Sequence, residues 1–191
     1  NVTGSCFLIE TEEKKFIIDC GFFQGEEIDN NHNKFYFNPK EIDFVILTHA
    51  HIDHSGRIPY LVKMGFKGKI YCTKATFELT RIMLLDSAKV MFEDYLSSKK
   101  KALRRGEEIK EPLYYEEDVI NTYDNFFLLE YNDVVKITPN LSFVLKDAGH
   151  IIGSSYVELN IKDNGNIKKI IFSGDLGNRN KPIVRDPVCP S

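Results

Sequence analysis

Three of the five histidines in this chain lie within six residues, in the run H-A-H-I-D-H at positions 49–54. An apolar segment of the buried-strand type, residues 44–47, comes directly before the run. We expect residues 55–64, which follow it, to form a helix with Ser55 as the N-cap. So many metal-binding side chains between a buried strand and a helix are typical of a metal site rather than of a surface loop. The fold must therefore hold a ligand-rich turn at the edge of a sheet.

The spacing of the run divides its side chains between two directions. In extended backbone, residues two apart point to the same side, so His49 and His51 can face one metal ion. Asp53 and His54 lie beyond, where the chain turns, and can face a second ion. Imidazole and carboxylate groups suit zinc, and a catalytic zinc site keeps one position open for water. Manganese or iron could occupy the same set of nitrogen and oxygen ligands.

Two ions need further ligands, and two downstream segments offer them. His150 lies in D-A-G-H-I-I-G-S-S, residues 147–155, and Asp175 lies in F-S-G-D-L-G, residues 172–177. Each follows a strand-like run and is bracketed by glycines, which let the backbone turn sharply and come close to a ligand. Beside the histidine cluster, we expect both to be metal ligands. Asp19 is either a turn residue or the acceptor of a hydrogen bond that fixes the tautomer of a ligating imidazole.

The cysteines favour free thiols in a reducing cytoplasm over a disulfide framework or a thiolate zinc finger, because they are scattered and form no C-x-x-C pair. They are Cys6, Cys20, Cys72 and Cys189. Cys20 directly follows Asp19 and would face the other way in a strand, so we do not expect it to be a ligand. His32 lies in an Asn-rich stretch, residues 25–39, which we expect to be a loop with a solvated histidine. No apolar run approaches the roughly 20 residues that span a bilayer, so no membrane contact is expected.

The rest of the chain has strands, then helices, then strands, which predicts an α+β or layered α/β domain. The expected strands are residues 6–10, 15–20, 44–47, 69–72, 134–137, 142–146, 155–161 and 169–173. A long helix should begin after the N-cap Thr73, and a second helix should cover residues 116–125. The long helix has an apolar stripe at helical spacing, which we expect to be core. Its members are Phe77, Ile82, Leu85, Ala88, Phe92 and Leu96.

The formal net charge of −3 over 191 residues gives no overall basic field that would attract nucleic acid. Any such binding must come from a local patch. The basic run at residues 99–105, at the end of the long helix, is a candidate for contact with phosphates. It can equally be a solvated helix end whose cations complement the helix dipole, and we favour this second interpretation.

The order of these residues resembles the first four motifs of the metallo-β-lactamase superfamily. The resemblance implies an α/β fold, the αββα four-layer sandwich, with two zinc ions at the sheet edges. Shorter segments are similar to the β-CASP branch, which includes the pre-mRNA 3′-end cleavage endonuclease and ribonuclease J. These segments are residues 2–5, 19–25, 54–59, 149–154 and 173–177.

Carried over to this chain, the family pattern implies a role for each matching residue. It gives the first zinc the ligands His49, His51 and His150. It gives the second zinc the ligands Asp53, His54 and Asp175, with Asp175 bridging both ions. Asp19 matches the first motif, which supports the ligand loops. In this family the chain continues into closing strands, the inserted β-CASP domain and a last zinc-binding histidine. Residues 1–191 are therefore expected to be the N-terminal portion of a metallo-β-lactamase domain, inactive or weakly active alone.

The expected reaction of the intact protein is hydrolysis of an RNA phosphodiester by a hydroxide that two zinc ions share, with Asp53 orienting it or taking its proton. Hydrolysis of DNA, a thioester or another ester on the same fold is an alternative. A further alternative is an inactive scaffold subunit of an RNA-processing complex, although the filled ligand positions argue against it. RNA is the expected partner, and the sequence leaves a homodimer open.

Overall fold

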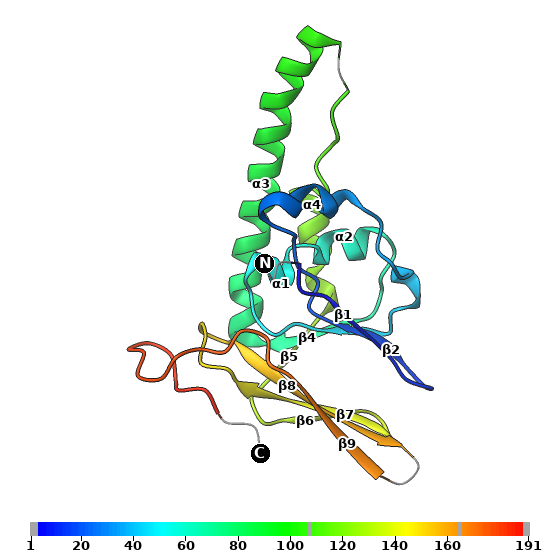
Figure 1. The fold of residues 1–191 in the computed structure, drawn as a ribbon, viewed down its shortest axis with the longest axis vertical. Coiled ribbons are helices and arrows are strands. Elements are labelled where there is room, and N and C mark those ends of the chain that lie inside the picture. The colour runs from blue at the N-terminus through cyan, green and yellow to red at the C-terminus, as the bar shows by residue number, and fades with distance from the viewer. Residues whose placement is uncertain (1–3, 107, 164–165, 189–191) are drawn as a thin grey trace.

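The computed structural model describes residues 4–106, 108–163 and 166–188. Two β-sheets pack face to face, with five strands in the order β1-β2-β3-β4-β5 in one and four in the order β6-β7-β8-β9 in the other. The helices lie beyond the five-stranded sheet, on the side away from the second sheet (Figure 1). The predicted mixed α/β sandwich is confirmed, and no helix of the described residues covers the outer face of the second sheet.

The first sheet sets one wall of the site. Strands β1 (Phe7–Glu10) and β2 (Lys15–Ile18) form an antiparallel hairpin. From β2 the sheet continues with parallel strands β3 (Phe44–Ile46), β4 (Lys69–Thr73) and β5 (Phe126–Leu129). The carboxyl ends of parallel strands meet at one edge, which is where ligands bind in open α/β sheets. Asp19 follows β2 at this edge, and the histidine run follows β3.

The second sheet is antiparallel throughout. Its strands are β6 (Val134–Thr138), β7 (Leu141–Asp147), β8 (Ser155–Asp163) and β9 (Asn166–Phe172). Because β8 runs opposite to its two neighbours, the ends of β7 and β9 lie at the edge where β8 begins. The segments that carry His150 and Asp175 therefore leave the sheet at one common edge.

Successive side chains along the strands of the first sheet face two different cores in turn, as the pleat requires. In β2, Phe16 and Ile18 belong to the core between the sheets, whereas Ile17 packs in the core under the helices. In β3, Phe44 and Ile46 face the second sheet and Val45 faces the helices. Both faces of these strands are thus buried, which explains why residues 44–47 are wholly apolar.

Three predicted elements differ from the structure. The expected helix at residues 55–64 is two short helices, α1 (Ile52–Ser55) and α2 (Ile58–Lys63). Ser55 ends α1 instead of capping a helix, and its hydroxyl donates to the carbonyl oxygens of Ala50 and His51. Pro59, in the first turn of α2, has no backbone N–H and suits a new helix start better than a helix interior.

The other two differences concern the ends of loops and helices. Residues 25–39 are not all loop, because Gly25–His32 forms a 3-10 helix (η1), and a second one, η2 (Pro39–Glu41), follows it. The helix expected at residues 116–125 is shorter, with α4 (Glu116–Ile120) followed by η3 (Tyr123–Asn125). The strand β5, which comes next, was not predicted.

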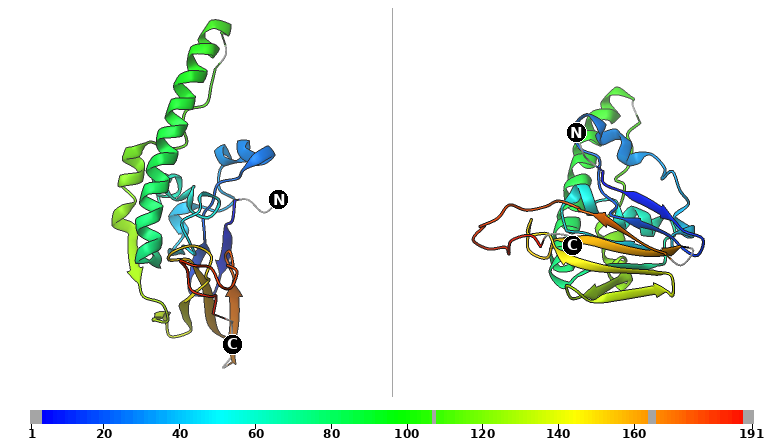
Figure 2. Two further views of the ribbon diagram at one scale, coloured as in Figure 1. Left: turned by 90° about the vertical axis from the view of Figure 1, so that its left-hand side faces the viewer. Right: turned by 60° about the horizontal axis from the view of Figure 1, so that its bottom comes forward.

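The long helix α3 (Lys74–Arg105) begins as predicted, since the Thr73 hydroxyl accepts a hydrogen bond from the backbone N–H of Thr76. The predicted core stripe is wrong for much of its length, because Ile82, Phe92 and Leu96 are exposed. The buried residues of the helix are Thr76, Thr80, Leu84, Ala88 and Ala102. The two views in Figure 2 give the reason: α3 packs on the domain through its first half and projects beyond it.

No helix of the described part of the chain combines the length and the apolar character that crossing a membrane requires.

Candidate metal centre

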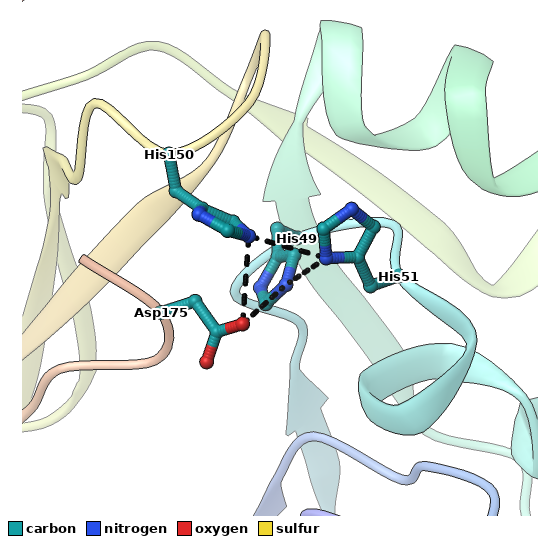
Figure 3. A group of neighbouring side chains, drawn as sticks. All are labelled: His49, His51, His150 and Asp175. Carbon is teal, nitrogen blue, oxygen red and sulfur yellow. Dashed lines mark hydrogen bonds and ion pairs between the residues drawn. The ribbon is translucent and has the colours of Figure 1, made fainter. Parts of the chain in front are cut away.

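Four side chains converge where the edges of the two sheets meet (Figure 3). His49 and His51 follow β3, His150 follows β7, and Asp175 follows β9. One ligand atom of each lies within 4.8 Å of the others. The Nδ1 atom of His51 lies 3.1 Å from Nε2 of His49 and 3.2 Å from Nε2 of His150. The structure thus brings together side chains from distant parts of the sequence, and their role as metal ligands stays a prediction.

The carboxylate of Asp175 faces two sets of imidazole nitrogens. Its Oδ2 atom lies 3.7 Å from Nε2 of His49 and 3.4 Å from Nε2 of His150. Its Oδ1 atom lies 3.4 Å from Nε2 of His54. The four-residue group itself contains neither His54 nor Asp53. His54 adjoins the group through Asp175 and through its own ring, whose centroid lies 4.1 Å from that of His49. The charge of Asp53 acts on the His54 ring.

A buried hydrogen-bond chain lies behind the first-sheet histidines. Asp19 is 1% exposed and has a left-handed backbone, with φ of 60°. Its Oδ1 accepts from the Thr48 backbone N–H (2.8 Å), and its Oδ2 accepts from the Thr48 hydroxyl (2.9 Å). The same Oδ2 lies 2.7 Å from Nδ1 of His54. Asp19 thus hydrogen-bonds the imidazole of His54, which lies beside the four-residue group; the role of that ring as a metal ligand stays a prediction.

The hydrogen bonds of Asp19 and Thr48 determine which tautomer His54 and His49 adopt when their rings are neutral. An ionised carboxylate only accepts, so the His54 ring donates to Asp19 from Nδ1. The Thr48 hydroxyl donates its proton to Asp19. Its oxygen therefore accepts a hydrogen bond from Nδ1 of His49, which lies 3.0 Å away. In the neutral form of each ring, Nε2 is then unprotonated and faces Asp175. Such outer hydrogen bonds orient the ligands in metal sites.

Burial controls the protonation of these groups. It lowers the pKa of His49 to about 2, with the neighbouring histidines acting in the same direction. Burial also opposes charging of His54, but the hydrogen bond and charge of Asp19 raise the pKa of that ring overall. Burial lowers the pKa of His150, against the opposing charge of Asp175. The pKa of Asp19 is raised by burial, which the bonds from His54 and Thr48 oppose.

The donor set fits a metal cation. His49 remains neutral near pH 7, and its Nε2 lone pair faces the Asp175 carboxylate oxygen at 3.7 Å. Two electron-rich atoms that face each other across such a gap are stabilised by a cation between them. Imidazole nitrogen with carboxylate oxygen is the ligand chemistry of zinc, and also of manganese and iron.

Two glycines let the loops of the centre come together. A Cβ atom on Gly21 would lie 1.6 Å from the carbonyl oxygen of Asp53, and one on Gly177 would lie 1.7 Å from that of Gly149. The backbone N–H of Gly177 also donates to the carbonyl of Ala148 at 2.9 Å. The glycines thus allow close packing of one loop on another, and the second contact fixes the Asp175 loop against the His150 loop.

Three hydroxyl residues of the centre, Thr48, Ser154 and Ser155, were missed by sequence reasoning. The Thr48 carbonyl accepts from the backbone N–H (2.8 Å) and the hydroxyl (3.1 Å) of Ser155, which joins the two sheet edges. The Ser154 hydroxyl oxygen accepts from the backbone N–H of His150 (3.0 Å) and of Ile151 (3.2 Å). Their position beside the ligands is the one sequence signal that could have identified them.

The remaining predicted residues lie outside the cluster. Cys20 is buried in the core under the helices, in agreement with its exclusion as a ligand, and Cys6 and Cys72 are also free thiols. Cys189 and residues 1–3 lie outside the described residues. His32 is exposed, as expected.

Comparisons with known proteins identify the relatives of this chain. The family model of the Metallo-beta-lactamase superfamily matches residues 1–133. Ribonuclease TTHA0252 of Thermus thermophilus is 39% identical over 189 residues, which are 99% of this chain and 38% of that protein. Transcription termination factor FttA of Methanosarcina mazei is 34% identical over 179 residues, 91% of this chain and 25% of that protein. The chain thus spans well under half the length of these relatives.

The solved structures show the same fold at low identity. Native FEZ-1 metallo-beta-lactamase from Legionella gormanii superposes with a TM-score of 0.53 at 16% identity, covering 95% of this chain and 62% of that one. The family model covers more than half of the sequence, and His49, His51, His150 and Asp175 of this chain meet at the edge of the sandwich. On these grounds the chain belongs to the metallo-beta-lactamase superfamily.

Proposed function

We propose that this chain carries the zinc-binding part of a ribonuclease active site, in a protein of the β-CASP branch that hydrolyses RNA phosphodiester bonds. The superfamily contains metal-dependent hydrolases, and relatives named a ribonuclease and a transcription termination factor support RNA as the substrate. The observation that carries the proposal is the convergence of three imidazoles and a carboxylate at one point. The activity of the whole protein is part of this proposal.

The two oxygens of Asp175 support a site for two ions. We assign His49, His51 and His150 to the first ion, on the side of Oδ2. We assign His54 and Asp53 to the second, on the side of Oδ1, with Asp175 shared. Bound zinc would supply Lewis acidity toward the phosphate and lower the pKa of water at the site.

The side chains of the centre have separate tasks in this proposal. Asp19 and Thr48 hold the rings of His54 and His49 with the lone pair of Nε2 toward the centre. Burial keeps His49 neutral, so no proton has to leave that ring before a cation binds. Asp53 would accept a proton from the attacking water or orient it, because a carboxylate beside the second ligand set is suited to general base catalysis.

The proposal is tested by zinc content and RNA cleavage of the intact protein with His51→Ala. We expect the variant to lose cleavage and bound zinc while its circular dichroism spectrum stays unchanged, because His51 faces both His49 and His150. His32→Ala is the matched control, since His32 is exposed and outside the cluster. A His51→Ala protein that cuts RNA at the normal rate would contradict the metal assignment.

The substrate is tested separately by running short RNA, short DNA and a chromogenic ester side by side. RNA cleavage that exceeds the other two activities supports the proposed ribonuclease. Faster hydrolysis of DNA or the ester would keep the metal centre and replace the substrate. No hydrolysis of any of them by a zinc-loaded protein would favour a scaffold role.

A further inference from the structure

An apolar pocket of about 480 Å³ opens beside the metal centre. Its walls come from three parts of the chain: the first half of α3, the loops that carry the histidines, and the segment at residues 181–184. The α3 wall consists of Leu79 and Met83. His51 and His150 form the side nearest the cluster, and both appear at the centre in Figure 3.

The composition of this pocket is unusual for an open surface. Apart from the two histidines, Lys181 is the single polar residue among the described residues that line it. Met83, Ile152 and Ile183 are exposed in the pocket walls. Contiguous apolar surface of this kind marks a binding site more often than a solvated face. Its volume lies within the roughly 300–1,000 Å³ of small-molecule sites.

We propose that the pocket receives a nucleobase of the RNA, from a nucleotide next to the phosphate that is cut. This inference rests on the proposed function, because it takes the scissile phosphate to lie at the ligand cluster. His51 and His150 belong both to the cluster and to the pocket wall, so a nucleotide adjoining that phosphate can place its base in the pocket. An enzyme that holds a splayed base commonly encloses it between apolar side chains.

The chemistry of the walls suits a flat aromatic ring on an anionic strand. A methionine thioether makes favourable contacts with aromatic rings and adapts to different shapes. Lys181 places a positive charge near His150, where it can attract a phosphate of the same strand. The described lining offers few hydrogen-bonding groups for the edge of a base. The pocket should therefore require a base without selecting which one.

The test compares RNA oligonucleotides that carry one abasic nucleotide at successive positions around the cleavage site. With the intact protein, we expect one position next to the cut to weaken binding, and to lower kcat/KM, by about tenfold. Binding is measured by fluorescence anisotropy with EDTA present, so it does not depend on cleavage. The base preference at that position is measured on the four standard nucleotides and should be slight.

Met83→Ala should weaken binding of normal RNA and should remove most of the penalty of the abasic position, because both changes delete the same contact. Met83→Leu should restore both the binding of normal RNA and the penalty of the abasic position. Met64→Ala is the matched control, because Met64 is 42% exposed, close to the 39% of Met83, and lies outside the pocket. That variant should keep the full abasic penalty.

The two proposals fail in different ways. If RNA is cut but no abasic position weakens binding, the pocket does not hold a base, and another segment of the protein is the better occupant. An unchanged abasic penalty in Met83→Ala would also overturn the inference. If the zinc-loaded protein cuts no RNA, the proposed function fails, while the anisotropy data still decide whether the pocket holds a base.

Discussion

The first sheet places His49 and His54 against buried side chains, whereas the second sheet places His150 and Asp175 on loops that reach solvent. The side chain of His49 is fully buried, and that of Asp175 is 44% exposed. The first-sheet half of the centre is oriented by side-chain hydrogen bonds through Asp19 and Thr48. The second-sheet half is oriented by backbone contacts between loops. One half thus depends on protonation and the other on steric fit.

The largest effect is expected from Gly177→Ala, which disrupts the close packing of loops in the second-sheet half. The added Cβ would lie 1.7 Å from the carbonyl oxygen of Gly149, so the two loops must separate. We expect the free energy of unfolding to fall by about 3 kcal/mol, together with a loss of zinc affinity. Urea unfolding with chelator and a zinc titration measure the two effects.

Gly106→Ala is the control for that substitution. Gly106 has φ of 68°, but nothing lies within 4 Å of an added Cβ, so this variant tests left-handed strain alone. Its cost should be about 1–2 kcal/mol with zinc affinity unchanged. Equal effects on zinc binding in both variants would mean that loop contact does not hold the second-sheet half.

Asp19→Asn disrupts the side-chain hydrogen bonds that orient the first-sheet half. The NH2 group of the asparagine amide can only donate. Where it replaces Oδ2 of Asp19, the His54 ring and the Thr48 hydroxyl lose their acceptor. We expect zinc affinity to fall about 10–100-fold, the usual effect of losing an outer hydrogen-bond partner. Competition with a chromophoric chelator measures it. Asp43→Asn, which removes a surface ion pair with Lys14, should leave the affinity unchanged; unchanged affinity in Asp19→Asn would remove the distinction between the halves.

The pH dependence of stability should also follow the first-sheet half. The pKa of His49 is about 2 in the folded protein, against an ordinary value near 6.5. The unfolded chain therefore takes up a proton below about pH 6.5 that the folded chain excludes. Stability from this group is complete above that pH and decreases as the pH falls. The decrease is at most about 1.4 kcal/mol per pH unit, and the raised pKa of His54 acts in the opposite direction.

Urea unfolding at about pH 7 and about pH 5, with chelator present, measures this slope. His49→Gln should reduce the loss of stability between the two pH values, whereas His32→Gln should keep most of it. The same slope in His49→Gln as in the unsubstituted protein would show that another group carries the acid sensitivity.

The smallest effect is expected from Ser154→Ala. The variant removes the acceptor for the backbone N–H groups of His150 and Ile151. The free energy of unfolding should fall by about 1 kcal/mol, and zinc affinity should change little, because the Gly177 contact still holds the loop. Ser97→Ala, at an exposed site on α3, should be neutral or slightly stabilising. A larger loss of zinc affinity than in Gly177→Ala would reverse the order given to the two contacts.

The ligand cluster could be predicted because its information is local. His49, His51 and His54 lie in one short run after an apolar strand, and glycines mark the loops of His150 and Asp175. The role of these residues as zinc ligands stays a prediction until metal is measured. Thr48 was missed although it directly precedes His49, because its hydrogen bonds are made with Asp19, which is 29 positions away and meets it through strand pairing.

The errors in predicting the fold from the sequence have a related cause. A helical period shows that residues share a face, but not which part of a long helix touches the domain, so Ile82 and Phe92 were wrongly assigned to the core. The four-residue strand β5 pairs with β4, more than 50 positions earlier, and its sequence alone resembles any short apolar run. The break between α1 and α2 was signalled by Pro59, which we read as helix interior.

The projection of α3 beyond the domain has a consequence for local unfolding. Its 32 residues make a rod of about 48 Å, roughly three times the radius of gyration of about 16 Å of a compact chain this long. Beyond Ala88, the buried residue of the helix is Ala102, and the other contacts are side contacts such as that of the Phe92 ring with Tyr115. Amide protons of this outer half should therefore exchange with solvent through local fraying, well before those of β2 and β3, which exchange only when the whole domain unfolds.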